Sequence, residues 1–228
     1  MNRIFLVRHS VSAGNLDNSL YFTEKECDIE LAPGGEKQAE DAADKITGLL
    51  RDVYEENNKR IGIKLEWSDF YFNMFYSPYV RAKQSADIIK GKIESTKGYK
   101  IESYNQNPIL VERKWGQLRD IVTNGEKTED HFNFFYTPEN GESFADVYNR
   151  TELFHQHLLS RETYDNVIIV AHGEFNKVYL MRLLGWDIDE FDKWRTPRNG
   201  EVYMLNRSGR DSWMLSPFTP LTERTIKH

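Results

Sequence analysis

Cysteine is almost missing from this chain of 228 residues, because Cys27 is its only one. An internal disulfide and a metal cluster held by several cysteines are therefore excluded, and a reducing, intracellular setting is expected. Long apolar runs are missing too: no segment approaches the roughly 20 apolar residues of a membrane span, and the opening stretch MNRIFLVRHS reaches charge too early for a signal peptide. We expect a soluble, cytoplasmic protein that does not bind membranes.

An excess of positive charge is also missing, since 36 acidic residues outnumber 30 lysines and arginines and the formal net charge is −6. A nucleic acid held mainly through its phosphates is therefore not an expected partner. A small anionic substrate is compatible with this charge, because a few local arginines can set the sign of one pocket. Internal repeats, low-complexity tracts and linkers rich in Pro or Ser are absent, so residues 1–228 are predicted to form a single domain.

Short apolar runs rich in β-branched residues are the clearest structural pattern in the chain. The runs at 3–7 and 166–172 are continuous, which is typical of strands buried on both faces of a parallel sheet. Residues 70–77 and 107–111 have weaker strand patterns. Residues 200–217 read as a hairpin whose turn is RSGR, and this hairpin would add an antiparallel edge to the sheet.

Amphipathic helices are predicted between these strands, because apolar residues recur there at spacings of three and four. Two such segments are 35–54 and 81–93, a third helix follows Ser143 as its cap, and a fourth begins near Phe175. Strands that alternate with helices form an open sheet with helices on both faces. The predicted fold class is α/β: a three-layer α/β/α arrangement with a mostly parallel sheet and an antiparallel edge.

Charged or titratable residues follow four of the predicted strands. Ligands of open α/β sheets bind in the crevice outside the carboxyl ends of the strands, so these side chains are expected to converge on one rim. They are Arg8 and His9 after the first strand, Ser77 and Arg81 after the next, Glu112 after the third, and His172 with Gly173 after the last.

This set of side chains suits phosphoryl transfer. Guanidinium groups offer forked donors that match phosphate oxygens and neutralise charge in the transition state. A neutral imidazole can attack phosphorus to form a phosphohistidine, and a carboxylic acid can protonate the leaving oxygen and then activate water. No metal or cofactor is required, and the absence of H-x-x-x-H spacing argues against zinc.

These side chains lie in sequence motifs whose composition and order resemble those of the histidine phosphatase superfamily, in its phosphoglycerate-mutase-like branch. The resemblance covers nearly the whole chain. It is carried by LVRHSVSAGN, LAPGGEKQA, YSPYVRAKQSA, ERKWG, PENGESFADVYNR and VIIVAHGE. The stretches FFYTPENGESFADVYNR and YLMRLLGWDIDEFDKWRTPRNGEVYML look most like the fungal and plant broad-range acid phosphatases.

The resemblance implies a phosphoglycerate-mutase-like fold and a metal-independent phosphomonoesterase that acts on a small phosphorylated substrate, with a homodimer as its possible assembly. The resemblance also implies that His9 is the nucleophile, that Glu112 is the acid, and that Arg8, Arg81 and His172 bind the phosphoryl group. Further substrate contacts are expected from Ser10, Ser12, Asn15 and Gly173.

Ser10, Val11 with Ala13, and Glu174 depart from the family pattern, and Ser10 and Glu174 bear most on the chemistry. Ser10 replaces the usual glycine after the nucleophile, where a hydroxyl could donate to phosphate or a side chain could crowd the backbone. Glu174 follows His172 and Gly173, where a carboxylate aimed at phosphate would repel it. We expect Glu174 to point away from the phosphate as a first-turn helix residue.

Two alternative functions stay open at this point. The first is a phosphoglycerate mutase, although residues 116–140 offer Arg119 and Lys127 but no adjacent arginine pair for a substrate carboxylate. The second is a catalytically weak binding or regulatory protein on the same fold, since a fold does not imply a function. Ser10 and Glu174 are the features that keep this second alternative open.

Several other residues are alternatives to these assignments. Glu102, Glu126 and Glu142 compete with Glu112 as the acid, and Glu142 and Ser143 are expected to cap a helix instead. His155 and His157 are expected to face solvent, and His131 to lie in the core or the pocket wall. The predicted aromatic wall consists of Tyr21, Phe22, Trp115, Phe134 and Phe135.

Overall fold

The sheet has six strands in the order β3-β2-β4-β1-β5-β6. The structure is a computed structural model that describes residues 2–62, 70–119, 133–161 and 164–219. The strands are β1 (Arg3–Arg8), β2 (Phe70–Tyr76), β3 (Tyr99–Gln106), β4 (Asn166–Ala171), β5 (Val202–Arg207) and β6 (Trp213–Leu215). The first four pair in parallel, and β5 and β6 pair antiparallel, which confirms the mostly parallel sheet with an antiparallel edge.

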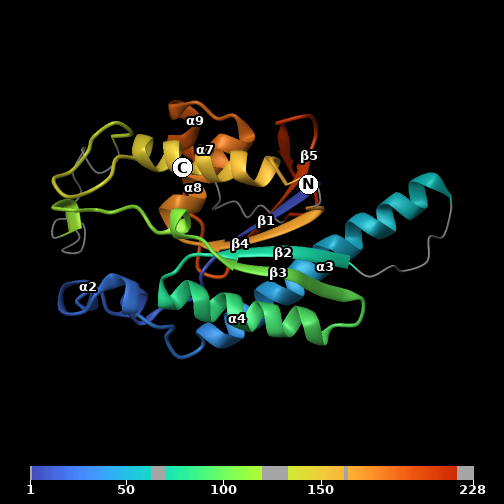
Figure 1. Ribbon diagram of the computed structural model, residues 1–228, viewed down its shortest axis with the longest axis horizontal. Helices are drawn as coiled ribbons and strands as arrows, with labels where there is room; N and C mark the ends of the chain where they lie inside the picture. The colour runs from blue at the N-terminus through green and yellow to red at the C-terminus, as the bar shows by residue number, and fades with distance from the viewer. Residues whose placement is uncertain (1, 63–69, 120–132, 162–163, 220–228) are drawn as a thin grey trace.

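Helices cover both faces of this sheet, which confirms the three-layer prediction. In Figure 1, α3 and α4 lie on one face, and α7, α8 and α9 lie on the other. The helices are α1 (Ala13–Leu16), α2 (Leu20–Thr23), α3 (Gly35–Ile61), α4 (Val80–Ser95), α7 (Phe144–Leu159), α8 (Gly173–Leu184) and α9 (Ile188–Lys193), with short 3-10 helices η1 (Glu26–Asp28) and η2 (Pro108–Leu110). No helix in the described ranges is both long enough and apolar enough to cross a membrane.

The two faces of β1 explain why its sequence is a continuous apolar run. Ile4 and Leu6 pack into the core beneath α7 and α8, whereas Phe5 and Val7 pack into the core beneath α3 and α4. Successive side chains of a strand point to opposite faces of the sheet, so a strand covered on both sides needs apolar residues at every position. β4 follows the same rule, and all six of its residues are buried.

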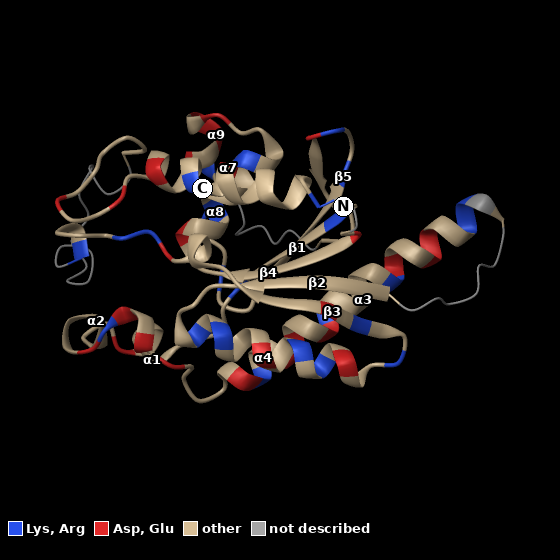
Figure 2. Cartoon of the chain, in the orientation of Figure 1, with Lys and Arg blue, Asp and Glu red and all other residues tan. Residues whose placement is uncertain are grey.

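Charged residues of both signs are spread along α3 and α4, as Figure 2 shows. On α4, Lys83 pairs with Asp87 at 2.7 Å and Lys90 pairs with Glu94 at 2.6 Å, each one helical turn apart. Exposed pairs of this kind contribute little to stability. These helices present mixed charge to solvent, so the sign of any pocket is set by the residues that line it.

The prediction of a strand over 107–111 is wrong. Pro108 begins the 3-10 helix η2, and the side chain of Asn107 caps it by accepting a hydrogen bond from the Ile109 N–H. Proline cannot donate to a strand ladder, which favours the turn. The strand lies just before this segment, as β3. β3 is an edge strand with several exposed or half-buried positions, so it lacks a continuous apolar run.

The prediction that His155 faces solvent is also wrong, whereas His157 is exposed as expected. His155 is fully buried between α7 and α8, with Nδ1 2.8 Å from the Tyr179 hydroxyl and Nε2 2.9 Å from Asp211 Oδ1. A carboxylate only accepts, so Nε2 carries the proton and Nδ1 accepts from tyrosine. Burial and the charge of Arg182 lower the pKa of His155 to about 4.

The buried His155 ring should make the free energy of unfolding depend on pH between 6.5 and about 4. Its folded-state pKa of about 4 lies below the ordinary 6.5, so the unfolded chain takes up the proton first as the pH falls. The neutral ring therefore contributes stability above pH 6.5 that is lost as the pH falls towards 4. In urea titrations, we expect the free energy of unfolding of the wild type to approach that of His155→Gln over this window. Parallel pH dependences of the two proteins would contradict the prediction.

Candidate active site

The carboxyl ends of three neighbouring strands bring the predicted residues together. β1 continues into His9, β4 into His172 and β2 into Ser77, and these strands lie side by side in the order β2-β4-β1. The ring centroids of His9 and His172 are 5.1 Å apart, and His172 Nε2 lies 2.7 Å from the Ser77 hydroxyl. The predicted convergence at one rim of the sheet is confirmed.

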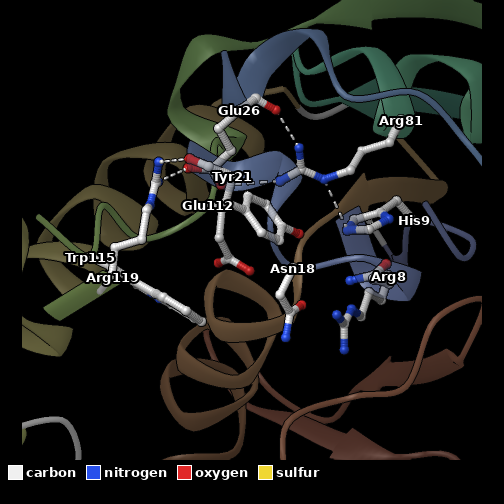
Figure 3. Close-up of a pocket in the computed structure, with 10 residues that line it drawn as sticks. Arg8, His9, Asn18, Tyr21, Glu26, Arg81, Glu112, Trp115 and Arg119 are labelled. Atoms are coloured by element: carbon white, nitrogen blue, oxygen red, sulfur yellow. Dashed lines mark hydrogen bonds and ion pairs between the residues drawn. The ribbon is translucent and has the colours of Figure 1, made fainter. Parts of the chain in front are cut away.

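A pocket with a cavity volume of about 150 Å³ opens at this rim (Figure 3). Its walls come from the segments after β1, from η1, from the first turn of α4 and from the segment after η2. The lining residues are Arg8, His9, Asn15, Asn18, Tyr21, Glu26, Arg81, Glu112, Trp115 and Arg119. Three arginines and two carboxylates therefore share one small cavity.

His9 is held in a single orientation at the base of this pocket. Its Nδ1 lies 2.7 Å from the Ser10 carbonyl oxygen, which can only accept, so Nδ1 carries the proton. Nε2 is then unprotonated, and Arg81 Nε donates to it at 3.3 Å. Burial first, and then the charges of Arg81 and Arg8, hold the pKa of His9 well below its ordinary value. The ring is neutral at neutral pH, with a lone pair on Nε2.

His172 lies directly behind His9 and is not itself one of the lining residues. It is fully buried, and the Tyr79 ring contacts it with a centroid separation of 5.0 Å. Burial, followed by the charges of Arg81, His9 and Arg8, holds the pKa of His172 well below its ordinary value. Within the described residues, its Nδ1 has no hydrogen-bond partner.

Arg8 reaches the pocket because Gly173 leaves room for it. Its Nη1 donates to the Pro197 carbonyl at 2.7 Å, and its Nε has no hydrogen-bond partner among the residues that the structure describes. A Cβ on Gly173 would lie 3.2 Å from Arg8 Cζ and 2.7 Å from Thr196 Cγ2. Gly173 is therefore a packing requirement of the arginine, and it does not line the pocket.

Arg81, in the first turn of α4, is almost fully buried. Its Nη1 donates to the Glu26 carbonyl at 2.6 Å, and its Nη2 donates to Glu26 Oε1 at 3.2 Å. Together with the contact to His9, these bonds fix the guanidinium plane beside the imidazole. The placement of Arg81 at the site follows the prediction, but its partner Glu26 was not among the expected residues.

Glu112 enters the pocket from the segment after η2, rather than directly from a strand. Its carboxylate accepts from the N–H groups of Glu174 and Phe175 at the start of α8, at 3.2 and 3.0 Å. Arg150 holds the backbone of the same segment by donating to the carbonyls of Val111 at 2.8 Å and Glu112 at 3.2 Å. The backbone and the side chain of Glu112 are thus both held by hydrogen bonds from residues of α7 and α8.

Other candidates for the acid lie elsewhere. Glu102 is exposed on β3, and Glu142 accepts from Arg150 Nε at 3.0 Å. Ser143 caps α7 as expected, but its capping partner is Asp146 rather than Glu142. Glu126 lies outside the described residues, as do Lys127 and His131. Among the described candidates, Glu112 is the carboxylate that lies in the pocket beside the histidine and arginine groups.

The loop after His9 supports the pocket from below. The Ser10 N–H donates to the Ser85 hydroxyl at 2.9 Å, and the Ser10 carbonyl orients His9. Ser12 donates through its hydroxyl to Asn15 Oδ1 at 3.0 Å, and Asn199 donates to the same oxygen at 2.9 Å. Of the four predicted substrate contacts, Asn15 lines the pocket, whereas Ser10, Ser12 and Gly173 lie behind the lining.

Glu174 is buried in the first turn of α8 and is not a lining residue of the pocket. Its Oε2 accepts from Trp115 Nε1 at 2.8 Å and lies 3.6 Å from Arg113 Nη1. Burial raises the pKa of Glu174 to about 7, and the nearby Glu112 adds to this shift. The carboxylate thus faces Trp115 and Arg113, in line with the expectation that it points away from the phosphate.

The predicted aromatic wall is correct for Tyr21 and Trp115 only. Phe22 and Phe135 are exposed, and Phe134 packs in the core against Phe144 and Phe191. Asn18 and Glu26 also line the pocket, although the sequence pattern does not predict them there. Arg119 lines it too, although the sequence offers it only as an arginine without an adjacent partner. A metal-binding group of three or more His, Cys, Asp or Glu side chains is not found in the part of the chain that the structure describes.

Comparisons with known proteins show which proteins the chain resembles. The family model described as histidine phosphatase superfamily (branch 1) matches residues 4–217. The chain is 27% identical to Phosphoglycerate mutase-like protein AT74 of Arabidopsis thaliana over 89% of its own length. It is 25% identical to Broad-range acid phosphatase DET1 of Saccharomyces cerevisiae over 72% of its length. The chain spans 64% of the plant protein and 55% of the yeast protein.

A solved structure shows the same fold at low sequence identity. It is the native structure of a mycobacterial glucosyl-3-phosphoglycerate phosphatase, 18% identical with a TM-score of 0.68. The match covers 96% of this chain and 99% of that one. The described strands and helices therefore form the fold of that phosphatase.

Replacing Gly173 by alanine tests the close approach of Arg8. The added methyl group would meet Thr196 Cγ2 and the Arg8 guanidinium, so the guanidinium must move. We expect the affinity for inorganic phosphate, measured by titration calorimetry, to fall about tenfold, or about 1.4 kcal/mol. Gly48→Ala on α3 is the matched control, because a Cβ there meets nothing within 4 Å. Equal phosphate affinity in both variants would refute the packing role of Gly173.

Proposed function

Because the chain belongs to the histidine phosphatase superfamily (branch 1), we propose that it is a metal-independent phosphomonoesterase that acts through a phosphohistidine on His9. The observation that carries this proposal is the protonation of His9. Its Nδ1 proton is held by the Ser10 carbonyl, and the unprotonated Nε2 lies in the pocket beside Arg81. A neutral imidazole with a fixed lone pair is what a nucleophile on phosphorus requires.

The first step transfers the phosphoryl group to the enzyme. Arg8 and Arg81 hold the phosphoryl oxygens and neutralise the charge that develops on them. Arg81 Nε, which donates to His9 Nε2 in the free site, turns to a phosphoryl oxygen and frees the Nε2 lone pair. His9 Nε2 then forms a bond to phosphorus while the bond to the ester oxygen breaks, and Glu112 gives its proton to the departing alkoxide. A phosphoryl oxygen would also supply a partner for His172 Nδ1, which has none within the described residues.

The second step returns the enzyme to its starting state. Glu112, now a carboxylate, takes a proton from water, and the water oxygen attacks phosphorus as the N–P bond breaks. The contacts of Glu112 with the start of α8 hold its carboxylate in one place through both steps. The products are an alcohol and inorganic phosphate, and no metal takes part.

The alternatives are weaker on present observations. A mutase would return the phosphoryl group to the substrate, and the sequence lacks the adjacent arginine pair expected for a substrate carboxylate. A non-catalytic binding protein was suggested by Ser10 and Glu174, but neither lines the pocket. The name of the yeast relative supports a phosphatase of the broad-range acid type. Cytoplasmic localisation, a small phosphorylated substrate and a homodimer stay predictions.

His9→Ala should abolish turnover and leave the fold intact, because it removes the nucleophile and no strand contact of the core. We expect phosphate release from a panel of phosphomonoesters in EDTA to fall at least about 10³-fold. Circular dichroism and thermal melting control for the fold. A phosphoenzyme that is labile in acid and stable in alkali should form in the wild type and be missing in the variant. A near wild-type rate in the variant would exclude the phosphohistidine mechanism.

Arg81→Ala should lower kcat through lost stabilisation of the transition state. Removing one preorganised donor to a developing oxyanion costs about 10²- to 10³-fold in kcat. Arg81→Lys is the matched control. It keeps the positive charge but loses the planar pair of donors of the guanidinium, so its rate should lie between those of the wild type and the alanine variant. A change below about tenfold in Arg81→Ala, roughly 1.4 kcal/mol, would show that Arg81 does not touch the phosphoryl group.

A further inference from the structure

The segment that carries the proposed acid and the first turn of α8 hold each other by reciprocal contacts. Glu112 accepts from the N–H groups of Glu174 and Phe175, at 3.2 and 3.0 Å. In the opposite direction, Glu174 Oε2 accepts from the Trp115 indole N–H at 2.8 Å and lies 3.6 Å from Arg113 Nη1. Two glutamates that are 62 residues apart in the chain thus each bind the segment of the other.

The contacts made by the Glu174 side chain are shielded from water. This side chain is only 11% exposed, and Arg113 is almost fully buried, with its guanidinium carbon 4.0 Å from the centre of the Phe144 ring. A hydrogen bond in such surroundings is stronger than one in water, because the local dielectric constant is low. Trp115, which lines the pocket, is therefore held from behind by a residue that does not line it.

Glu112 depends on this anchoring because its segment has no regular structure of its own. Residues 111–115 lie in neither a helix nor a strand. Arg150 holds the backbone at the start of the segment, and Glu174 holds its end through Trp115. In the proposed mechanism Glu112 delivers a proton to the leaving oxygen, and a misplacement of about 1 Å can cost about 10²-fold in rate.

The anchoring does not require a negative charge on Glu174. Burial raises the pKa of this carboxyl group to about 7, and the charge of Arg113 opposes the shift while that of Glu112 adds to it. At pH 6 the group is mostly protonated, so it repels neither Glu112 nor a bound phosphate. Its carbonyl oxygen still accepts from the Trp115 indole. A glutamine at this position would have the same shape, the same acceptor and the same charge.

We propose that Glu174 is a positioning residue for proton delivery, which fixes Trp115 and the segment of Glu112 against α8 so that the acid faces the leaving oxygen. The inference rests on the proposed function, and it gives a role to a residue that departs from the family pattern. Trp115 and Arg113 belong to the segment of the acid and not to that of the nucleophile. Loss of Glu174 should therefore slow protonation of the leaving group more than attack on phosphorus.

Two aryl esters separate these two effects. Phenyl phosphate and 4-nitrophenyl phosphate present the same ring to the pocket, but phenolate is the more basic leaving group and needs the proton more. The readout is kcat/KM at pH 6, which does not include hydrolysis of the phosphohistidine that both esters form. Glu174→Ala should lower kcat/KM for phenyl phosphate about tenfold more than for 4-nitrophenyl phosphate. Glu112→Gln should change the ratio of the two values further in the same direction.

Three further variants test how Glu174 acts. Glu174→Gln should keep the wild-type ratio at pH 6, because its amide oxygen accepts from the Trp115 indole. Trp115→Phe breaks the same hydrogen bond from the other side, so it should change the ratio as Glu174→Ala does, and it serves if that variant does not fold. Glu190→Ala is the matched control: it removes a carboxylate that accepts from the Trp194 indole at 3.2 Å away from the pocket lining, and it should leave the ratio unchanged.

Equal losses on the two esters in Glu174→Ala, or a change of the ratio below about threefold, would show that Glu174 does not position the acid and would leave the phosphatase in place. A change in Glu174→Gln as large as that in Glu174→Ala would refute anchoring through the indole. An unchanged ratio in Glu112→Gln would remove Glu112 as the acid and the inference with it. Failure of the wild type to hydrolyse either ester would overturn the proposed function itself.

Discussion

The parallel pairing of β1 with β4 is the constraint on which the rest of the site depends. This register places Arg8 opposite Ala171, so that the next residues, His9 and His172, leave the sheet together. The apolar residues before them are buried on both faces, which holds the two strand ends rigidly. Any slip of one residue would turn every side chain of the strand to the opposite face and separate the two rings.

Burial then decides the chemistry of these groups. Both histidines are withdrawn from water beside arginines, and these two effects act in the same direction on the pKa of each ring. The charges of Arg8 and Arg81 are in turn held by backbone carbonyls and by Glu26. The site therefore combines neutral imidazoles with cationic guanidiniums, a combination that favours an oxyanion.

Prediction from the sequence succeeded where local pattern and burial agree. Continuous apolar runs located β1 and β4, and the periodic apolar residues located α3, α4 and α7. It failed where tertiary surroundings override local pattern. The edge strand β3 has no apolar run to mark it, and His155 is buried because Tyr179 and Asp211, 24 and 56 residues farther along, satisfy its ring. Phe134 looked like a pocket residue but fills the core.

Local patterns in the sequence were enough to predict the fold class and to place Arg8, His9, Arg81 and His172 at one rim, because strand ends and helix starts are local features that carry these four residues. The protonation of these residues and the identity of their neighbours came from the packing of distant segments. The protonated nitrogen of His9, the burial of Glu174 and the bridge from Arg81 through Glu26 to Arg119 depend on contacts between segments far apart in the chain. Local patterns carry no information on such contacts, since each depends on how the layers of the fold pack.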